Sequence, residues 1–158
     1  MNQPKEKIHH YMSVELNNQT WKLLEKKDRD DNDDKRMIIF AKASLYHWRK
    51  SPNYRPVNEQ RGKWLIAHVY AVLNQGKESL SHAKTCMDIT MNESLKDFDL
   101  AYAYECKARA YASLRDSEKM GKCFFNAKKA GEKIKSDKDR KLFFDDLYND
   151  PWYECIVT

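Results

Sequence analysis

A helical segment occurs twice in this chain, as RGKWLIAHVYAVL at residues 61–73 and as YAYECKARAYASL at residues 102–114. Each copy has an alanine, a tyrosine three residues later and a leucine three residues after that: Ala67, Tyr70 and Leu73, then Ala108, Tyr111 and Leu114. A second amphipathic pattern follows each copy, as in a helical hairpin. The repeat therefore predicts stacked helical hairpins, an architecture that usually binds other molecules.

The composition predicts a single all-α domain over residues 1–158. A chain of 158 residues is long enough to bury one core. It is 41% hydrophobic and 34% charged, with only four glycines and four prolines. Strands joined by tight turns would need more glycine and proline, so the composition favours helices.

No metal or cofactor is expected. The four cysteines, Cys86, Cys106, Cys123 and Cys155, contain no C-x-x-C pair and are interpreted as reduced thiols. The acidic segment 28–34 lacks the glycine of a calcium loop at its sixth position and has Ile39 where that loop needs glutamate. We expect Asp33 and Asp34 to cap the following helix instead.

The two chain ends differ in polarity. Residues 1–8 are polar and expected to be flexible, with no apolar signal region, and no long apolar run follows. These features predict a cytoplasmic protein without a membrane span. Residues 151–158 form an apolar tail that should pack on its own domain or on a partner. A homodimer through this tail is a prediction, with four contact residues: Trp152, Tyr153, Ile156 and Val157.

Apolar spacing and capping signals predict about seven helices in antiparallel hairpins. The first four are expected over residues 9–27, 34–50, 58–74 and from 77 onward. The fifth should run from a cap at Asp97 or Asp99 to Leu114, the sixth should follow the turn at 115–117, and a short seventh should follow Ser136.

The repeated Ala, Tyr and Leu positions resemble those of tetratricopeptide repeats. In each copy the second helix offers small or apolar residues against them, namely Ala83 and Cys86, or Phe124 and Ala127. The period differs, since Tyr70 and Tyr111 are 41 residues apart (111 − 70) against 34 in the standard repeat. Segments 43–48, 61–64 and 97–105 are similar to those of uncharacterised bacterial tetratricopeptide-like proteins. The resemblance implies a right-handed α-α superhelix with a concave binding face.

Helical geometry predicts which residues share that face. On the third helix, Ile66, Val69, Tyr70 and Leu73 should be core, and on the fifth, Leu100, Tyr104, Ala108 and Tyr111. The opposite faces should lie side by side and form a candidate groove for a protein or peptide. Its residues are Arg61, Trp64, His68, Tyr102, Glu105 and Arg109. The alternative is a small-ligand-binding sensor, or an enzyme, that uses the same pocket.

Simpler readings of the same residues remain open. Glu105 and Arg109 are spaced i, i+4 and can pair with each other on one helix. Trp64 and His68 can be ordinary core contacts. His68 and Glu105 could also meet as a base and the group that orients it, but no nucleophile completes the pair, so catalysis is not expected.

A weak nucleic-acid binder is the remaining alternative. It depends on the lysines of the sixth helix, Lys119, Lys122, Lys129 and Lys133, with Phe125 and Tyr102 as stacking groups. Glu118 and Glu132 interrupt this basic face. Because the formal net charge of +5 is modest, nucleic acid is an unlikely partner.

Overall fold

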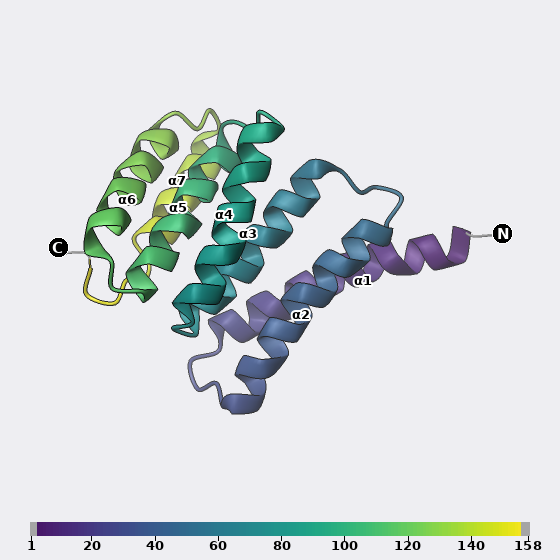
Figure 1. The fold of residues 1–158 in the computed structure, drawn as a ribbon. Coiled ribbons are helices and arrows are strands. Elements are labelled where there is room, and N and C mark those ends of the chain that lie inside the picture. The colour runs from purple at the N-terminus through teal and green to yellow at the C-terminus, as the bar shows by residue number, and fades with distance from the viewer. Residues whose placement is uncertain (1–2, 156–158) are drawn as a thin grey trace.

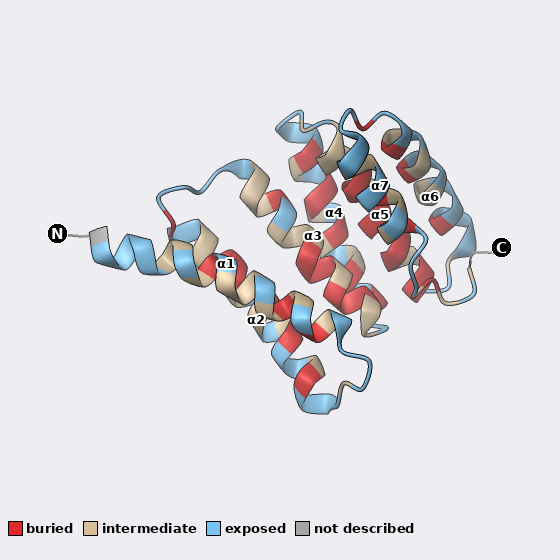
Figure 2. Ribbon diagram, turned by 180° about the vertical axis from the view of Figure 1, so that it is seen from behind, coloured by how far each residue is buried: buried red, intermediate tan, exposed pale blue. Residues whose placement is uncertain are grey.

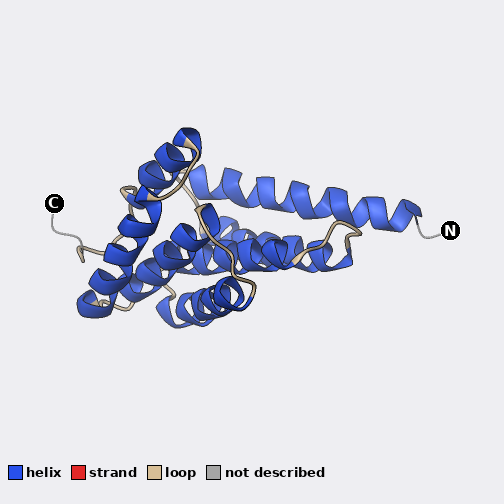
Figure 3. Ribbon diagram, turned by 90° about the horizontal axis from the view of Figure 1, so that it is seen from above, coloured by secondary structure: helices blue, strands red, loops and turns tan. Residues whose placement is uncertain are grey.

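The computed structural model describes residues 3–155, and these form seven α-helices and no strand (Figures 1 and 3). This confirms the all-α class. The helices are α1 (Gln3–Glu25), α2 (Asp31–Lys50), α3 (Pro56–Val72), α4 (Gly76–Asn92), α5 (Phe98–Ser113), α6 (Ser117–Glu132) and α7 (Asp137–Leu147). None of the helices described has the length and apolar character that crossing a membrane requires.

The helices pair as hairpins in chain order (Figure 1). Helix α1 packs on α2, α3 on α4, and α5 on α6. Neighbouring hairpins meet through α2 and α3 and through α4 and α5, and α3 also contacts α5 directly. Helix α7 packs against α5 and α6. Helix α5 is therefore the central element, with four helices around it.

The two copies of the repeat end in the same turn. Asn74 and Arg115 both take the left-handed conformation, with φ of 58° and 60°. The next N–H in each copy donates back to the carbonyl of the repeat tyrosine, at 2.8 Å to Tyr70 and 3.0 Å to Tyr111. This bond satisfies a carbonyl at the helix end. The turns also touch, since Nη1 of Arg115 donates to Oδ1 of Asn74 at 2.7 Å.

Three predicted boundaries at the amino-terminal hairpin are wrong. Helix α1 begins at Gln3 rather than residue 9 and ends at Glu25 rather than 27. Helix α2 begins at Asp31 rather than 34, because Asp30 is the cap and accepts from Asp33 N at 2.8 Å. Asp33 lies in the first turn instead, is buried, and accepts from Lys26.

The start predicted for α3 is two residues late, whereas Asp97 does occupy the predicted cap position of α5, without the side-chain bond of a cap. Helix α3 begins at Pro56, which suits a first helical position because its missing N–H would have no partner there. Neither Asp97 nor Asp99 caps α5 with its side chain. Asp97 occupies the cap position but accepts from the backbone N–H of Lys135 at 2.9 Å. It thereby connects the start of α5 to the α6–α7 loop.

The predicted division of α5 into a core face and a groove face is wrong (Figure 2). Its three expected groove residues, Tyr102, Glu105 and Arg109, are all buried. Of its expected core residues, Ala108 is buried, whereas Leu100, Tyr104 and Tyr111 are only partly buried. The reason is that other helices pack on several sides of α5. The small alanines of α5 allow this close approach.

The described part of the tail packs on its own domain. Trp152 is buried, and its Nε1 donates to Leu147 O at 2.9 Å. The hydroxyl of Tyr153 donates to the carbonyl of Val72 at 3.2 Å. Ile156 and Val157 lie outside the described residues. The homodimer through the tail stays a prediction.

Candidate functional site

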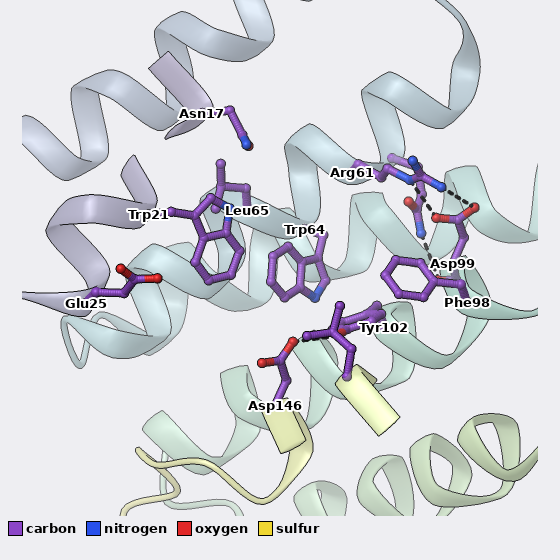
Figure 4. A pocket seen from close by; sticks show the side chains of 12 residues that line it. Asn17, Trp21, Glu25, Arg61, Trp64, Leu65, Phe98, Asp99, Tyr102 and Asp146 are labelled. Atoms are coloured by element: carbon purple, nitrogen blue, oxygen red, sulfur yellow. Dashed lines mark hydrogen bonds and ion pairs between the residues drawn. The ribbon is translucent and has the colours of Figure 1, made fainter. Parts of the chain in front are cut away.

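A pocket of about 470 Å³ opens between the first helices of the hairpins and α7 (Figure 4). Its lining comes from α1, α3, α5 and α7, which are separate in sequence. The lining residues are Asn17, Trp21, Glu25, Gln60, Arg61, Trp64, Leu65, Phe98, Asp99, Tyr102, Leu142 and Asp146. Helices α2, α4 and α6 contribute none of them.

The expected meeting of the third and fifth helices is confirmed at this pocket. The indole Nε1 of Trp64 donates to Oε2 of Glu105 at 3.0 Å. The rings of Trp64 and Tyr102 meet edge to face, with centroids 5.3 Å apart. At the same pocket, Nε of Arg61 lies 2.8 Å from Oδ1 of Asp99 (Figure 4).

A buried ion pair supports the pocket from behind. Glu105 and Arg109 bond to each other on one face of α5, and both side chains are almost fully buried. The Arg109 guanidinium also donates to the carbonyls of Asp146, at 2.6 Å, and Pro151, at 3.3 Å. Its other contact is the Trp152 ring, 4.3 Å from the guanidinium carbon to the ring centroid. One cation thus joins α5, α7 and the tail.

Burial raises the pKa of Glu105 above its usual value, while Arg109 and the Trp64 indole favour its charged form. Both carboxylate oxygens have a donor, because Oε1 accepts from Arg109 and Oε2 from the Trp64 indole. A buried carboxylate without such donors would be costly. The pair is a structural element that holds Trp64 in place.

Tyr102 links α5 to α7 at the pocket wall. Its hydroxyl donates to Oδ2 of Asp146 at 2.5 Å, and the side chain is buried (Figure 4). Burial and the Asp146 carboxylate raise the pKa of Tyr102, so the phenol stays protonated and remains a donor. The bond fixes the carboxylate of Asp146 at the pocket.

His68 lies behind the aromatic wall and is not placed as a base beside Glu105. Its ring stacks on Trp64, with centroids 5.0 Å apart, and lies 6.0 Å from Trp21. Its Nδ1 is buried with no hydrogen-bond partner in the described chain. Burial and the nearby Arg109 charge lower the pKa of His68 to about 3. Since the Glu105 oxygens bond to Trp64 and Arg109, the alternative His68–Glu105 pair is absent among the residues described.

The six predicted site residues thus occupy two positions. Arg61, Trp64 and Tyr102 line the pocket, whereas Glu105, Arg109 and His68 are absent from its lining and support it. The prediction missed the contributions of α1 and α7, above all Trp21, Glu25 and Asp146. Those helices lie outside the two repeated copies, so the repeat could not place them.

The Cys106 thiol, one residue from Glu105, is not an activated nucleophile. Cys106 is fully buried on α5, and burial raises its pKa well above the usual value. A thiol in that state remains protonated at neutral pH, whereas nucleophilic cysteines need a stabilised thiolate.

The lysine face of α6 is separate from the pocket. Lys122 lies 2.9 Å from Glu118, and Lys119 lies 3.6 Å from Asp116. Phe125 is exposed, with Lys129 over its ring at 4.8 Å. Tyr102 cannot stack on a base as expected, because it is buried and bonded to Asp146.

Comparisons of the chain with protein-family models, curated proteins and solved structures gave no match in any of the three.

Proposed function

We propose that this protein is an interaction module that binds a protein or peptide partner in the pocket between α1, α3, α5 and α7. The observation that carries the proposal is the pocket itself. It has aromatic side chains, charged groups of both signs and one wall from each hairpin. Side chains that combine apolar area with a polar group are typical of recognition surfaces.

The support behind the pocket favours binding without rearrangement. Trp64 is held by Glu105, and Asp146 is held by Tyr102. A site whose side chains are already ordered loses less conformational entropy when a ligand arrives. This favours a preformed binding face over an induced one.

We further infer that the hairpins stack as a tetratricopeptide-like, right-handed superhelix. The left-handed turns at Asn74 and Arg115 support this. Each joins the two helices of its hairpin, and each occurs at the same position in its copy of the repeat. The placement of the pocket on the first helices of the hairpins is a second support, since solenoid repeats usually bind on one face.

A random peptide library displayed on phage tests the proposal. Peptides enriched on the purified chain are measured against two variants, Leu142→Trp and Met91→Trp. Leu142 lines the pocket and is 48% exposed, whereas Met91 is 52% exposed on α4 and lies outside it. We expect Leu142→Trp to abolish binding and Met91→Trp to preserve it. Peptides that bind both variants equally would contradict the pocket as the site.

A small-molecule sensor is the second candidate. The pocket volume of about 470 Å³ lies within the range of small-ligand sites. Native mass spectrometry of the chain mixed with a library of polar small molecules separates the candidates. A retained compound that Leu142→Trp displaces, with no enriched peptide, would replace the peptide proposal by this one.

A further inference from the structure

The pocket carries negative charge on a protein that is basic overall. Three carboxylates line it, from Glu25, Asp99 and Asp146, and Arg61 supplies the single cation of the lining. The lining therefore has a formal excess of two negative charges (3 − 1), while the whole chain has a net charge of +5. The sign of the pocket is thus opposite to that of the molecule.

The one cation of the lining is already paired. Arg61 contacts Asp99 through Nε at 2.8 Å and through Nη2 at 3.3 Å. The two charges largely cancel, which leaves Glu25 and Asp146. Glu25 is exposed, and none of the described side chains donates to it. Asp146 accepts from Tyr102 through Oδ2, and its Oδ1 has no donor within the described range. These two oxygen groups are available to a ligand.

Aromatic rings lie between the two free carboxylates. Figure 4 shows the indole rings of Trp21 and Trp64 side by side, with Glu25 next to Trp21 and Asp146 below Trp64. The two indoles are stacked, with centroids 5.9 Å apart. Phe98 and Tyr102 complete the wall. Indole faces attract cations more strongly than other aromatic faces do.

The groups behind this wall do not add positive charge to it. His68 is neutral at physiological pH, because burial and the Arg109 charge lower its pKa to about 3. Arg109 is buried and bonded to the carboxylate of Glu105, which offsets much of its charge. A cationic ligand would therefore meet little opposing charge at the aromatic wall.

We propose that the pocket binds an ammonium or guanidinium group, carried by a lysine or arginine side chain of the partner. The group would lie against the wall formed by Trp21 and Trp64, next to the carboxylates of Glu25 and Asp146. This inference rests on the proposed function, because it names the part of the peptide that the pocket recognises. The carboxylates neutralise the charge of the group, and the indoles cover its alkyl stem.

A set of acetylated, amidated pentapeptides tests the proposal. They have the form Ala-Ala-Xaa-Ala-Ala, with Lys, Arg, norleucine or Glu at the centre, and their affinities are measured by calorimetry. We expect the Lys and Arg peptides to bind roughly tenfold or more tightly than the norleucine peptide, the size of effect expected for a cation on aromatic faces beside a carboxylate. The Glu peptide should show no binding.

A charge reversal in the pocket provides a more specific test. In Glu25→Lys we expect the preference for the Lys and Arg peptides to disappear. Glu6→Lys is the matched control, because Glu6 is an exposed residue of the same helix that does not line the pocket. Both variants change the net charge equally, so an equal loss in both would overturn the specific site.

The remaining outcomes separate this inference from the proposed function. If library peptides bind in a manner blocked by Leu142→Trp but carry no basic residue, the cation proposal fails and the interaction module stands. If tetramethylammonium and choline bind with Glu25 dependence while no peptide does, the pocket is a small-cation site, which overturns the peptide carrier. If neither peptides nor these cations bind, both proposals fail.

Discussion

Trp64 and Glu105 occupy equivalent positions in the two copies of the repeat, and they are bonded to each other. The indole Nε1 of Trp64 donates to Oε2 of Glu105 at 3.0 Å across a separation of 41 residues. The turn residues Asn74 and Arg115 are bonded across the same separation. Adjacent hairpins are therefore displaced so that equivalent residues meet both within the α3–α5 contact and at the turns that follow these helices. Residues that differ between the copies form these bonds.

The buried pair of Glu105 and Arg109 should contribute strongly to stability as a unit. Arg109→Met leaves a buried carboxylate, and Glu105→Gln leaves a buried guanidinium, so each should lower the free energy of unfolding by about 3–5 kcal/mol. The double variant removes both charges and keeps an acceptor for Trp64. We expect the double variant to lose less free energy of unfolding than the two single variants lose together, by at least about 1 kcal/mol.

Urea denaturation of the four proteins measures this cycle. Lys141 and Asp145 provide the comparison, because they form an i, i+4 pair at 2.6 Å with both side chains mostly exposed. Lys141→Met should change stability by less than about 1 kcal/mol. Strictly additive losses at Glu105 and Arg109 would show that the two groups act independently.

Two glycines of α6 should respond in opposite directions to alanine. A β-carbon at Gly131 would overlap the ring of Phe143 on α7, whereas one at Gly121 meets nothing within 4 Å. Gly131→Ala should therefore destabilise the protein by about 1–3 kcal/mol, and Gly121→Ala should stabilise it by up to about 1 kcal/mol. Thermal unfolding of both variants checks the signs.

Gly131→Ala should also weaken binding in the pocket, because α7 carries Asp146 and Leu142. Peptide affinity is measured at a temperature at which the variant is fully folded. Undiminished affinity in a destabilised Gly131→Ala protein would show that the position of α7 does not determine the site.

Much of the fold could be predicted from local pattern. The repeat at residues 61–73 and 102–114 predicted two hairpins, and the bonds between Trp64 and Glu105 agree with the expected meeting of their first helices. The exact first residue of each helix was harder to predict. Asp30, Asp33 and Asp34 are all suitable capping residues by type, so the sequence could not choose among them. The cap is Asp30, because it is the one with extended backbone.

The burial of α5 could not be predicted from periodicity. A period of 3.6 separates two faces only when one face meets solvent. Glu105 and Arg109 look like an exposed i, i+4 pair on one helix, yet α7 and the tail cover them and Arg109 bonds to Asp146 and Pro151. Likewise, no repeat relates Trp21 or Asp146 to α3, so their place in the pocket depends on tertiary structure.

His68 should make stability depend on pH below neutrality. Its pKa is about 3 in the folded protein, against an ordinary value of 6.5. Between those values the unfolded chain binds a proton that the folded chain does not, so stability falls as pH decreases from about 6.5 toward 3. From pH 7.5 to 5 the loss from this group should be about 2 kcal/mol.

His68→Phe isolates this contribution, because the ring can still stack on Trp64 but has no proton to gain. Urea denaturation at pH 7.5 and 5 should show a smaller loss in the variant than in the wild type. His82, whose pKa burial lowers to about 4, remains in both proteins and cancels in the comparison. Equal losses in the two proteins would mean that His68 titrates normally when folded.

Trp152 distinguishes a tail that supports its own domain from one that forms a dimer. The ring is buried, covers the Arg109 guanidinium at 4.3 Å and meets Phe124 edge to face at 5.2 Å. Trp152→Ala should therefore lower the free energy of unfolding by about 3–5 kcal/mol. Tyr148→Ala is the control, because Tyr148 is a large aromatic residue that is 61% exposed.

Light scattering over a range of concentrations tests whether Trp152 lies in a dimer interface, because it measures the mass of each protein in solution. Because the ring is already covered within the chain, the mass of Trp152→Ala should equal that of the wild type at every concentration at which both are folded. A variant that keeps the wild-type unfolding midpoint but halves in mass would place Trp152 in a subunit interface. If the wild type is a dimer and Trp152→Ala loses stability without losing mass, the interface lies elsewhere on the chain, because this ring then serves only the core of its own protomer.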